Sequence, residues 1–188
     1  MFIQTEETPN PASLKFIPDG AVVVENATFE FKNKEIAREK SELAFELFKV
    51  EGVASVFFGH DFITVTKSEE IDWKQIKTEI MATIVDFFVA GKSVLKDGIK
   101  KEVVSDENDS DVVKQIKELL EVKVKPAVAM DGGDVIYRGF EDGIVKLELK
   151  GSCSGCPSST ITLKNGIENM FKHYIPEVVA VEQFFEED

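Results

Sequence analysis

Cys153 and Cys156 are the only cysteines among the 188 residues of the chain, and two positions separate them. The surrounding segment, residues 151–157, reads GSCSGCP and includes Gly151 and Gly155. A thiolate is both a nucleophile and a ligand for soft metals. The pair can therefore bind a metal or an iron–sulfur cluster, or exchange a dithiol for a disulfide. An inert structural pair is a third interpretation, although a loop of glycine and serine is poor core material.

The number of thiols limits the metal site that one chain can complete. A tetrahedral zinc or a cubane iron–sulfur cluster normally takes four protein ligands. His60 is far from the pair in sequence, and His173 follows Cys156 without a second histidine three to five residues away. Two chains with their cysteine loops face to face would supply four thiolates to one cluster on a two-fold axis. Such a site would be exposed and shared, and would come apart more readily than a buried four-ligand cage.

Dithiol–disulfide exchange uses the same local pattern of strand, Cys-x-x-Cys and helix. A thioredoxin-type fold needs a βαβ unit before the motif and a long sheet-bearing segment after it. Only 32 residues follow Cys156, enough for one helix and one strand. The context therefore favours metal or cluster binding over redox exchange.

A strand and a helix are expected to position the two thiols. Residues 143–149 alternate apolar and polar side chains, which is typical of a half-buried strand, so the cysteines lie on the loop that leaves it. Pro157 suits the first position of a helix. Apolar residues follow it at mostly helical spacing: Ile161, Ile167, Met170, Phe171 and Tyr174. Cys156 is then expected at a helix N-terminus, where partial positive charge favours the thiolate.

The same loop belongs to an expected domain of residues 111–188, in the order helix, strand, strand, cysteine loop, helix, strand. Its first helix starts near residue 111 and is interrupted or ended by Pro126. A hairpin is expected to join residues 135–140 to residues 144–149, and a last strand covers residues 178–184. Residues 131–134, with the sequence DGGD, form a tight turn, and in a second interpretation this turn lies beside the cysteine loop.

Residues 1–96 are expected to form a first α+β domain, and residues 97–110 an acidic linker without periodicity. The expected strands of the first domain are residues 2–5, 14–16, 22–24, 27–31, 53–58 and 62–66. One amphipathic helix is expected over residues 35–48. A second helix starts at a capping box of Asp72 and Gln75 and stops at Gly91. The fold class is thus two small α+β domains joined by a linker.

The net charge and the lack of a long apolar segment argue against several classes of function. A formal net charge of −13 argues against nucleic acid or an anionic membrane as partner, because both are bound by clustered Lys and Arg. No apolar segment reaches the ~18 residues that span a bilayer, and Met1 is not followed by a basic and then an apolar region. The protein is expected to be soluble and unsecreted. Two cysteines make no disulfide framework, which fits a reducing compartment.

The chain resembles a known family, the Nfu-type iron–sulfur cluster scaffolds. Five segments are similar to the C-terminal NifU domain of that family: residues 131–134, 139–145, 151–159, 163–168 and 174–178. Residues 2–16 and 51–66 resemble the N-terminal domain that accompanies it. The likeness spans nearly the whole chain apart from the linker.

The resemblance implies a carrier that is not an enzyme. It would receive or assemble a [4Fe–4S] cluster on Cys153 and Cys156 of paired subunits and transfer it to apo iron–sulfur client proteins. Upstream cluster-assembly proteins are the other implied partners, and a homodimer or higher oligomer forms when the cluster is bound. Gly151 and Gly155 are candidates for cluster binding, because a missing side chain lets backbone amides approach the sulfides. Thr160 could donate in the same way, or serve as a first-turn residue.

The resemblance also bears on the first domain and on the compartment. The first domain has no cysteine, so a recognition or regulatory role is implied for it. Family members often carry Arg where this chain has Lys125, which keeps the charge but loses a planar bidentate donor. Eukaryotic relatives carry a targeting segment that is absent here. The expected location is the bacterial cytoplasm, with the mitochondrial matrix as the alternative for a processed form.

Overall fold

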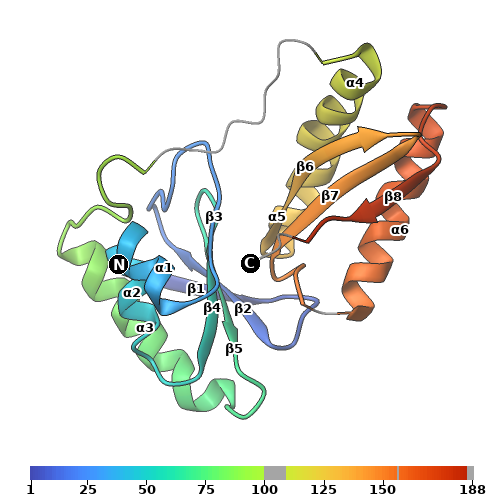
Figure 1. The fold of residues 1–188 in the computed structure, drawn as a ribbon. Helices are drawn as coiled ribbons and strands as arrows, with labels where there is room; N and C mark the ends of the chain where they lie inside the picture. The colour runs from blue at the N-terminus through green and yellow to red at the C-terminus, as the bar shows by residue number, and fades with distance from the viewer. Residues whose placement is uncertain (100–108, 156, 186–188) are drawn as a thin grey trace. The chain divides into compact units, whose positions relative to one another are not determined.

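The computed structural model describes residues 1–99, 109–155 and 157–185, and the side chains of residues 157–159 are not described. The chain divides into two compact units, Met1–Glu102 and Val103–Asp188, each with its own hydrophobic core (Figure 1). Both units are of the expected α+β class. Most of the predicted linker lies outside the described residues, so its bounds stay a prediction.

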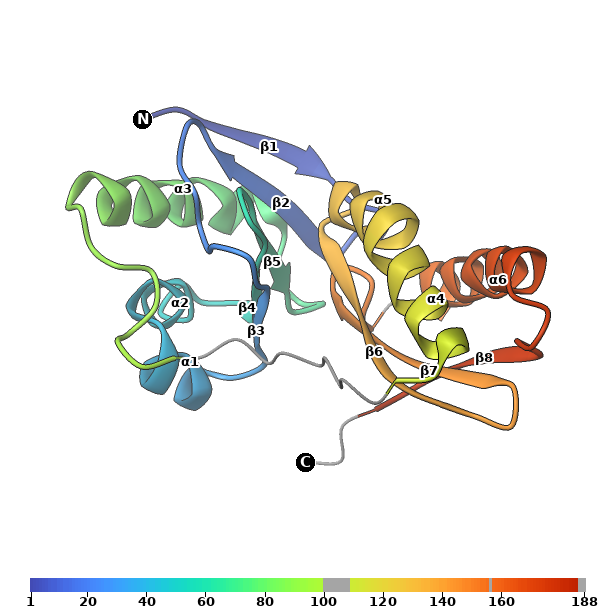
Figure 2. The same ribbon diagram turned by 90° about the horizontal axis from the view of Figure 1, so that it is seen from above.

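The first unit is an antiparallel sheet covered on one face by helices (Figure 2). The strand order is β1-β2-β5-β4-β3, with bounds Ile3–Glu7, Ser13–Pro18, Ile63–Lys67, Val53–Phe58 and Phe29–Phe31. The helices are α1 (Lys34–Lys40), α2 (Glu42–Leu47) and α3 (Trp73–Val89). The predicted hairpin of β4 and β5 is confirmed, and so is the capping box of Asp72 and Gln75 at the start of α3.

Two predictions for the first unit were wrong. Residues 35–48 form two helices instead of one, because Ser41 is extended and caps α2 through its hydroxyl. Residues 22–24 form no strand. The amides of Val23 and Val24 both donate to the His60 carbonyl, at 2.7 and 3.3 Å. Because two successive amides share one acceptor, the segment bends and does not pair with a neighbouring strand.

The second unit packs its helices on a three-stranded sheet of order β6-β7-β8. Its elements are α4 (Asp111–Leu119), the π-helix η1 (Leu120–Val124), α5 (Lys125–Met130), β6 (Gly133–Glu141), β7 (Ile144–Gly151), α6 (Pro157–Tyr174) and β8 (Ala180–Gln183). Strands β6 and β7 are antiparallel, whereas β8 pairs parallel to β7. The predicted order of elements is confirmed.

The hairpin turn and Pro126 show how local chemistry shapes this unit. Asp142 and Gly143 have positive φ angles of 51° and 79°, as a two-residue hairpin turn requires. Pro126 was expected to interrupt or end the first helix, and the π-helix η1 does interrupt it just before the proline, although the chain then continues helically to Met130. The i→i+5 bonding of η1, in which the Lys125 amide donates to the Leu120 carbonyl, adjusts the helix just before the proline.

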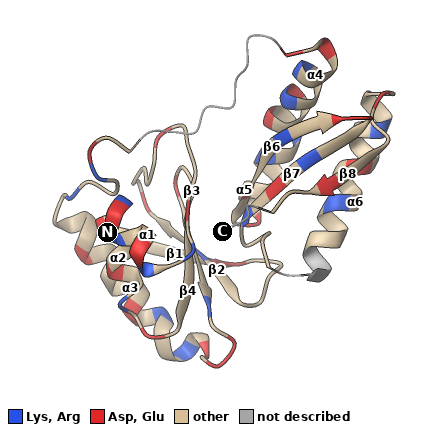
Figure 3. Ribbon diagram, viewed as in Figure 1, with Lys and Arg blue, Asp and Glu red and all other residues tan. Residues whose placement is uncertain are grey.

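Charged side chains of both signs are distributed over the elements of both units (Figure 3). Among the residues that the structure describes, no helix has the length and apolar character needed to cross a membrane.

Candidate cluster-binding site

The cysteine loop leaves the open end of the β6–β7 hairpin, as predicted. Gly151, the last residue of β7, is paired with Gly133, the first residue of β6. The Ser152 amide donates to the Gly132 carbonyl at 3.2 Å, and the Ser152 hydroxyl donates to the Asp131 carbonyl. These bonds confirm the interpretation that places residues 131–134 beside the loop.

Cys153 is buried against this glycine segment, with only 6% of its surface exposed. A Cβ atom placed on Gly133 would lie 2.7 Å from the Cys153 sulfur and 2.6 Å from the Lys150 carbonyl oxygen. The thiol therefore occupies space that exists only because residue 133 has no side chain. The loop of glycine and serine was judged to be poor core material, and for Cys153 that interpretation was wrong.

Hydroxyl groups hold the loop on both sides of Cys153. The Ser154 hydroxyl and amide donate to the Gly151 carbonyl at 2.9 and 3.1 Å. Thr160, on the first turn of α6, donates its hydroxyl to the Cys153 carbonyl at 3.0 Å. The sequence had suggested that Thr160 could donate to a cluster, whereas here it fixes the loop to the helix.

Gly151 and Gly155 both have positive φ angles, 70° and 85°, which glycine adopts without strain. Gly155 is exposed, and nothing lies within 4 Å of the position a Cβ would take. The backbone on that side of the loop is thus open to an approaching group. Its part in binding a cluster stays a prediction.

Burial raises the pKa of the Cys153 thiol from its ordinary value of 9.0 to about 11. A contact with the Ser152 hydroxyl opposes this effect, while the carboxylates of Asp131 and Asp134 add to it. A low-dielectric site beside two anions disfavours the thiolate. Cys153 is therefore a neutral thiol at pH 7 in this conformation.

Cys156 lies outside the described residues, so its expected thiolate character stays a prediction. Helix α6 begins at Pro157, the next residue, as the sequence indicated. Among the side chains that are described, which exclude Cys156, no group of three His, Cys, Asp or Glu converges on a common metal position. His60 belongs to the first unit, with its Nδ1 atom 3.1 Å from the Val24 carbonyl, and His173 contacts Tyr174 in the last turn of α6.

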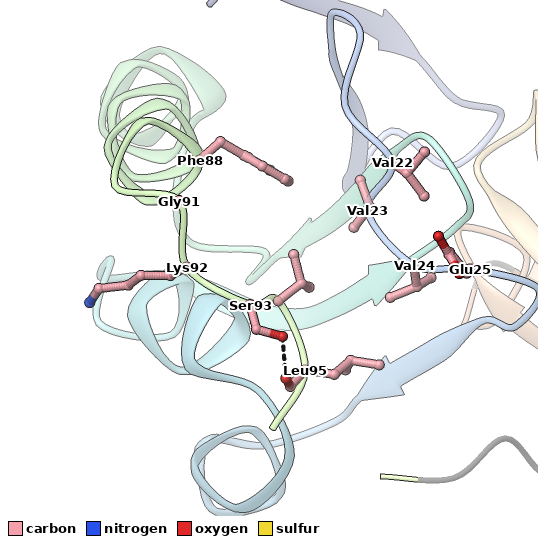
Figure 4. Close-up of a pocket in the computed structure, with 10 residues that line it drawn as sticks. Val22, Val23, Val24, Glu25, Phe88, Gly91, Lys92, Ser93 and Leu95 are labelled. Atoms are coloured by element: carbon pink, nitrogen blue, oxygen red, sulfur yellow. Dashed lines mark hydrogen bonds between the residues drawn. The ribbon is translucent and has the colours of Figure 1, made fainter. Parts of the chain in front are cut away.

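The first unit has a shallow pocket of about 420 Å³, far in sequence from the thiols (Figure 4). Residues 22–25 line one side, and Phe88 with residues 91–95 line the other. The lining is mainly apolar, and Ser93 donates its hydroxyl to the Leu95 carbonyl within it. With no cysteine in this part of the chain, the pocket cannot supply thiolate ligands.

Comparison with known families gives two matches that together cover most of the chain. Residues 3–91 match the family described as scaffold protein Nfu/NifU N terminal, and residues 116–182 match the NifU-like domain. These two stretches correspond to the α+β units described above.

Curated relatives match over the full chain. The human mitochondrial NFU1 iron–sulfur cluster scaffold homolog is 56% identical over 189 residues, covering 100% of this chain and 74% of the relative. The homolog of the same name in Drosophila sechellia is 51% identical over 190 residues, covering 100% of this chain and 66% of the relative. A solution NMR structure of a NifU-like protein from Saccharomyces cerevisiae has a TM-score of 0.47 at 28% identity, covering 52% of this chain and 86% of that one.

Proposed function

The chain belongs to the Nfu family of iron–sulfur cluster scaffold proteins, which are not enzymes, and from this premise we propose that it carries a [4Fe–4S] cluster shared between two subunits. The cluster is cargo: it is held transiently and transferred to apo-proteins. The observation that carries the proposal is the count of two cysteines per chain, half of the four thiolates that a cubane takes.

The geometry around Cys153 supports a site that forms only when metal or a cluster binds. Cluster binding requires the thiolate, and coordination to a metal removes the thiol proton even where the pKa is high. Cys153 would lose its proton and its burial as it becomes a ligand together with Cys156. Gly151 and Gly155 would let backbone amides approach the cluster sulfides. A free thiol that stays protonated until metal arrives is also slow to react with oxidants.

The proposed partners are apo iron–sulfur client proteins and the upstream proteins that deliver or assemble the cluster. We assign recognition of these partners to the first unit, because both cysteines lie in the second. The proposed location is the bacterial cytoplasm, with the mitochondrial matrix as the alternative that the names of the relatives support. Fractionation of the source cells distinguishes the two locations.

A thiol–disulfide oxidoreductase is the alternative raised by the Cys-x-x-Cys motif. An antiparallel hairpin precedes the motif, whereas a thioredoxin-type fold would place a βαβ unit there. Burial also disfavours Cys153 as an attacking thiolate. These observations support the scaffold over the oxidoreductase.

Anaerobic reconstitution with iron and sulfide tests the proposal. We expect about four irons and four sulfides per two chains, a dimer by native mass spectrometry, and a visible iron–sulfur absorption band. Cys153→Ser and Cys156→Ser should each abolish the band. A complete cluster on a monomer, or reversible disulfide chemistry with insulin reduction and no cluster, would contradict the proposal.

A further inference from the structure

Two hydroxyl groups tie the segment around Cys153 to other elements of the second unit. The Ser152 hydroxyl donates to the carbonyl of Asp131, the residue that caps the end of α5. The Thr160 hydroxyl, on α6, donates to the Cys153 carbonyl at 3.0 Å. We call these the two anchor bonds, because one lies on each side of the thiol and each joins the loop to a helix.

In this anchored position Cys153 cannot bind a cluster that two chains share. The residue is 6% exposed, and its sulfur fills the space beside Gly133 that a side chain would take. Thiolates of two chains meet on one cluster only if each sulfur reaches the surface of its own chain. Cluster binding therefore requires Cys153 to leave this position.

Glycines at both ends of the segment allow it to move. Gly151 and Gly155 have φ angles of 70° and 85°, and nothing lies within 4 Å of the position that a Cβ of Gly155 would take. Glycine changes its backbone angles at little steric cost. The residues between these two glycines can therefore turn outward together once the anchor bonds break.

We propose that Ser152 and Thr160 are positioning residues that stabilise a closed, cluster-free form of the loop, and that this stabilisation favours release of the cluster. The inference rests on the proposed function and deepens it. Free energy that favours the closed form is lost when the cluster binds, so it weakens cluster binding by the same amount. Because two chains hold one cluster, this factor enters the affinity twice.

Alkylation of Cys153 measures opening of the loop in the absence of a cluster. In the cluster-free Cys156→Ser chain, a small alkylating reagent reaches the buried sulfur when the loop opens locally. Ser152→Ala and Thr160→Val each remove one anchor bond. We expect each to raise the alkylation rate roughly two- to tenfold, as the loss of one hydrogen bond predicts. Thr160→Ser keeps the hydroxyl and should react at the rate of the parent chain.

Two controls separate local opening from a general loss of stability. Ser154→Ala is the matched variant, because the Ser154 hydroxyl donates to the Gly151 carbonyl within the loop and the Ser154 amide keeps that acceptor. It should change the rate by less than about twofold. Low concentrations of urea should hardly change the rate in any variant, because local opening exposes little surface, whereas global unfolding exposes much.

The direction of the Ser152→Ala effect is also informative. The Ser152 hydroxyl lies 3.8 Å from the Cys153 sulfur and lowers the pKa of that thiol. Its removal would by itself leave less thiolate and slow the reaction. A faster rate therefore reports opening of the loop.

Competition for the cluster tests the effect on release. Wild type and an equal amount of an isotope-labelled Ser152→Ala/Thr160→Val chain are reconstituted together anaerobically, with too little iron and sulfide to load every chain. Native mass spectrometry then counts the loaded dimers of each kind. Loaded dimers of the variant should outnumber those of wild type by about tenfold or more, because each chain has lost two hydrogen bonds of its closed form. A labelled Ser154→Ala chain should compete equally with wild type.

Each other outcome has a definite meaning. Unchanged alkylation in both anchor variants would overturn the inference, because rotation of the Cys153 side chain would then be enough to expose the sulfur. Faster alkylation with equal numbers of loaded dimers would overturn the effect on release. A wild type that forms no cluster-bearing dimer would overturn the proposed function, while alkylation would still show whether the anchor bonds close the loop.

Discussion

Gly133 and Cys153 contact each other across the open end of the β6–β7 hairpin, and the contact leaves no room for a side chain at position 133. In a Gly133→Ala variant the added methyl would press on the Cys153 sulfur and on the Lys150 carbonyl, both less than 3 Å away. The backbone carbonyl belongs to the sheet and cannot give way cheaply. We expect a loss of about 1 to 3 kcal/mol in unfolding free energy, measured by urea titration of the cluster-free chain.

The same substitution should displace Cys153 and make it react faster with a small alkylating reagent. Measured in a Cys156→Ser background, the rate reports Cys153 alone. Gly166→Ala is the control, because Gly166 lies within α6 and nothing lies within 4 Å of its added methyl. That variant should be as stable as wild type or more stable. Equal stability and equal alkylation rates in the Gly133 and Gly166 variants would show that Gly133 does not seat the thiol.

The raised pKa of the Cys153 thiol predicts that it is alkylated slowly in the folded chain. With a pKa of about 11, roughly one thiol in a thousand is ionised at pH 8, against about one in ten at the ordinary value of 9.0. In the cluster-free Cys156→Ser variant, alkylation at pH 8 should therefore be about a hundredfold slower than in the same chain unfolded in urea. Equal rates in the two states would contradict the burial of Cys153.

The raised pKa of Cys153 also makes the unfolding free energy depend on pH. The raised pKa means that the folded chain holds the thiol proton more tightly than the unfolded chain does. This contribution to folding is intact below pH 9 and is lost as pH rises from 9 towards 11. The unfolding free energy of the Cys156→Ser variant should fall in that window more steeply than that of a chain in which both cysteines are serine.

Residue types and spacing were enough to predict that the cysteine loop lies between a strand and a helix, but not that Cys153 is buried. The count of two cysteines led to the proposal of a shared site, and the alternation before Gly151 predicted the strand that ends there. The burial of Cys153 depends on Gly133, which lies 20 positions earlier and contacts it through strand pairing. The one available signal was the pair of glycines at the start of β6, which was interpreted from the sequence as a tight turn and, in a second interpretation, as a turn beside the cysteine loop, but not as the contact that buries the thiol.

At the scale of elements, the break between α1 and α2 depends on a contact that sequence periodicity cannot report. The Ser41 hydroxyl accepts from the Ala44 amide at 3.0 Å and donates to the Val94 carbonyl at 2.6 Å, 53 residues away. The pattern over residues 35–48 is that of one amphipathic helix, and this tertiary bond divides it. The chain after α3 thus determines where α2 begins.

Ser41→Ala tests this role, because it removes the N-cap of α2 and leaves the buried Val94 carbonyl without that donor. We expect a loss of about 1 to 3 kcal/mol in unfolding free energy by urea titration. Ser93→Ala removes a hydroxyl that bonds locally to Leu95 at an exposed position, and should change stability by less than about 0.5 kcal/mol. Similar effects from the two variants would show that the cap and its distant bond do not set the helix break.

Turns and helix starts that depend on neighbouring residues were predicted correctly. A segment whose structure depends on a contact with a residue far away in sequence was not. The hairpin turn at Asp142 and Gly143 and the capping box of α3 follow from short-range chemistry, and both were predicted. Residues 22–24 have the composition of a strand, but two of their amides share the His60 carbonyl, from the β4–β5 turn. Pro126 predicted that the first helix is interrupted or ends there, and the π-helix just before the proline does interrupt it, after which the chain continues helically.

At the scale of the whole molecule, the described core residues form two clusters that share no member. One contains Phe58, a fully buried residue of β4, and the other contains Phe171, a fully buried residue of α6. The change in composition near residue 97 predicted this division, while the exact ends of the linker stay a prediction. Both cysteines lie in the second unit, which is why we propose recognition as the role of the first.

Separate cores predict separate unfolding. Scanning calorimetry of the cluster-free full-length chain should resolve into two transitions, because each unit has its own cooperative core. Phe58→Ala and Phe171→Ala each remove a fully buried ring and should cost about 3 to 5 kcal/mol. Each should lower one transition by roughly 12 °C or more, a different one in each variant, and leave the other within about 2 °C. If either variant moved both transitions together, the two units would be a single folding unit, and assigning recognition to one and cluster chemistry to the other would lose its physical basis.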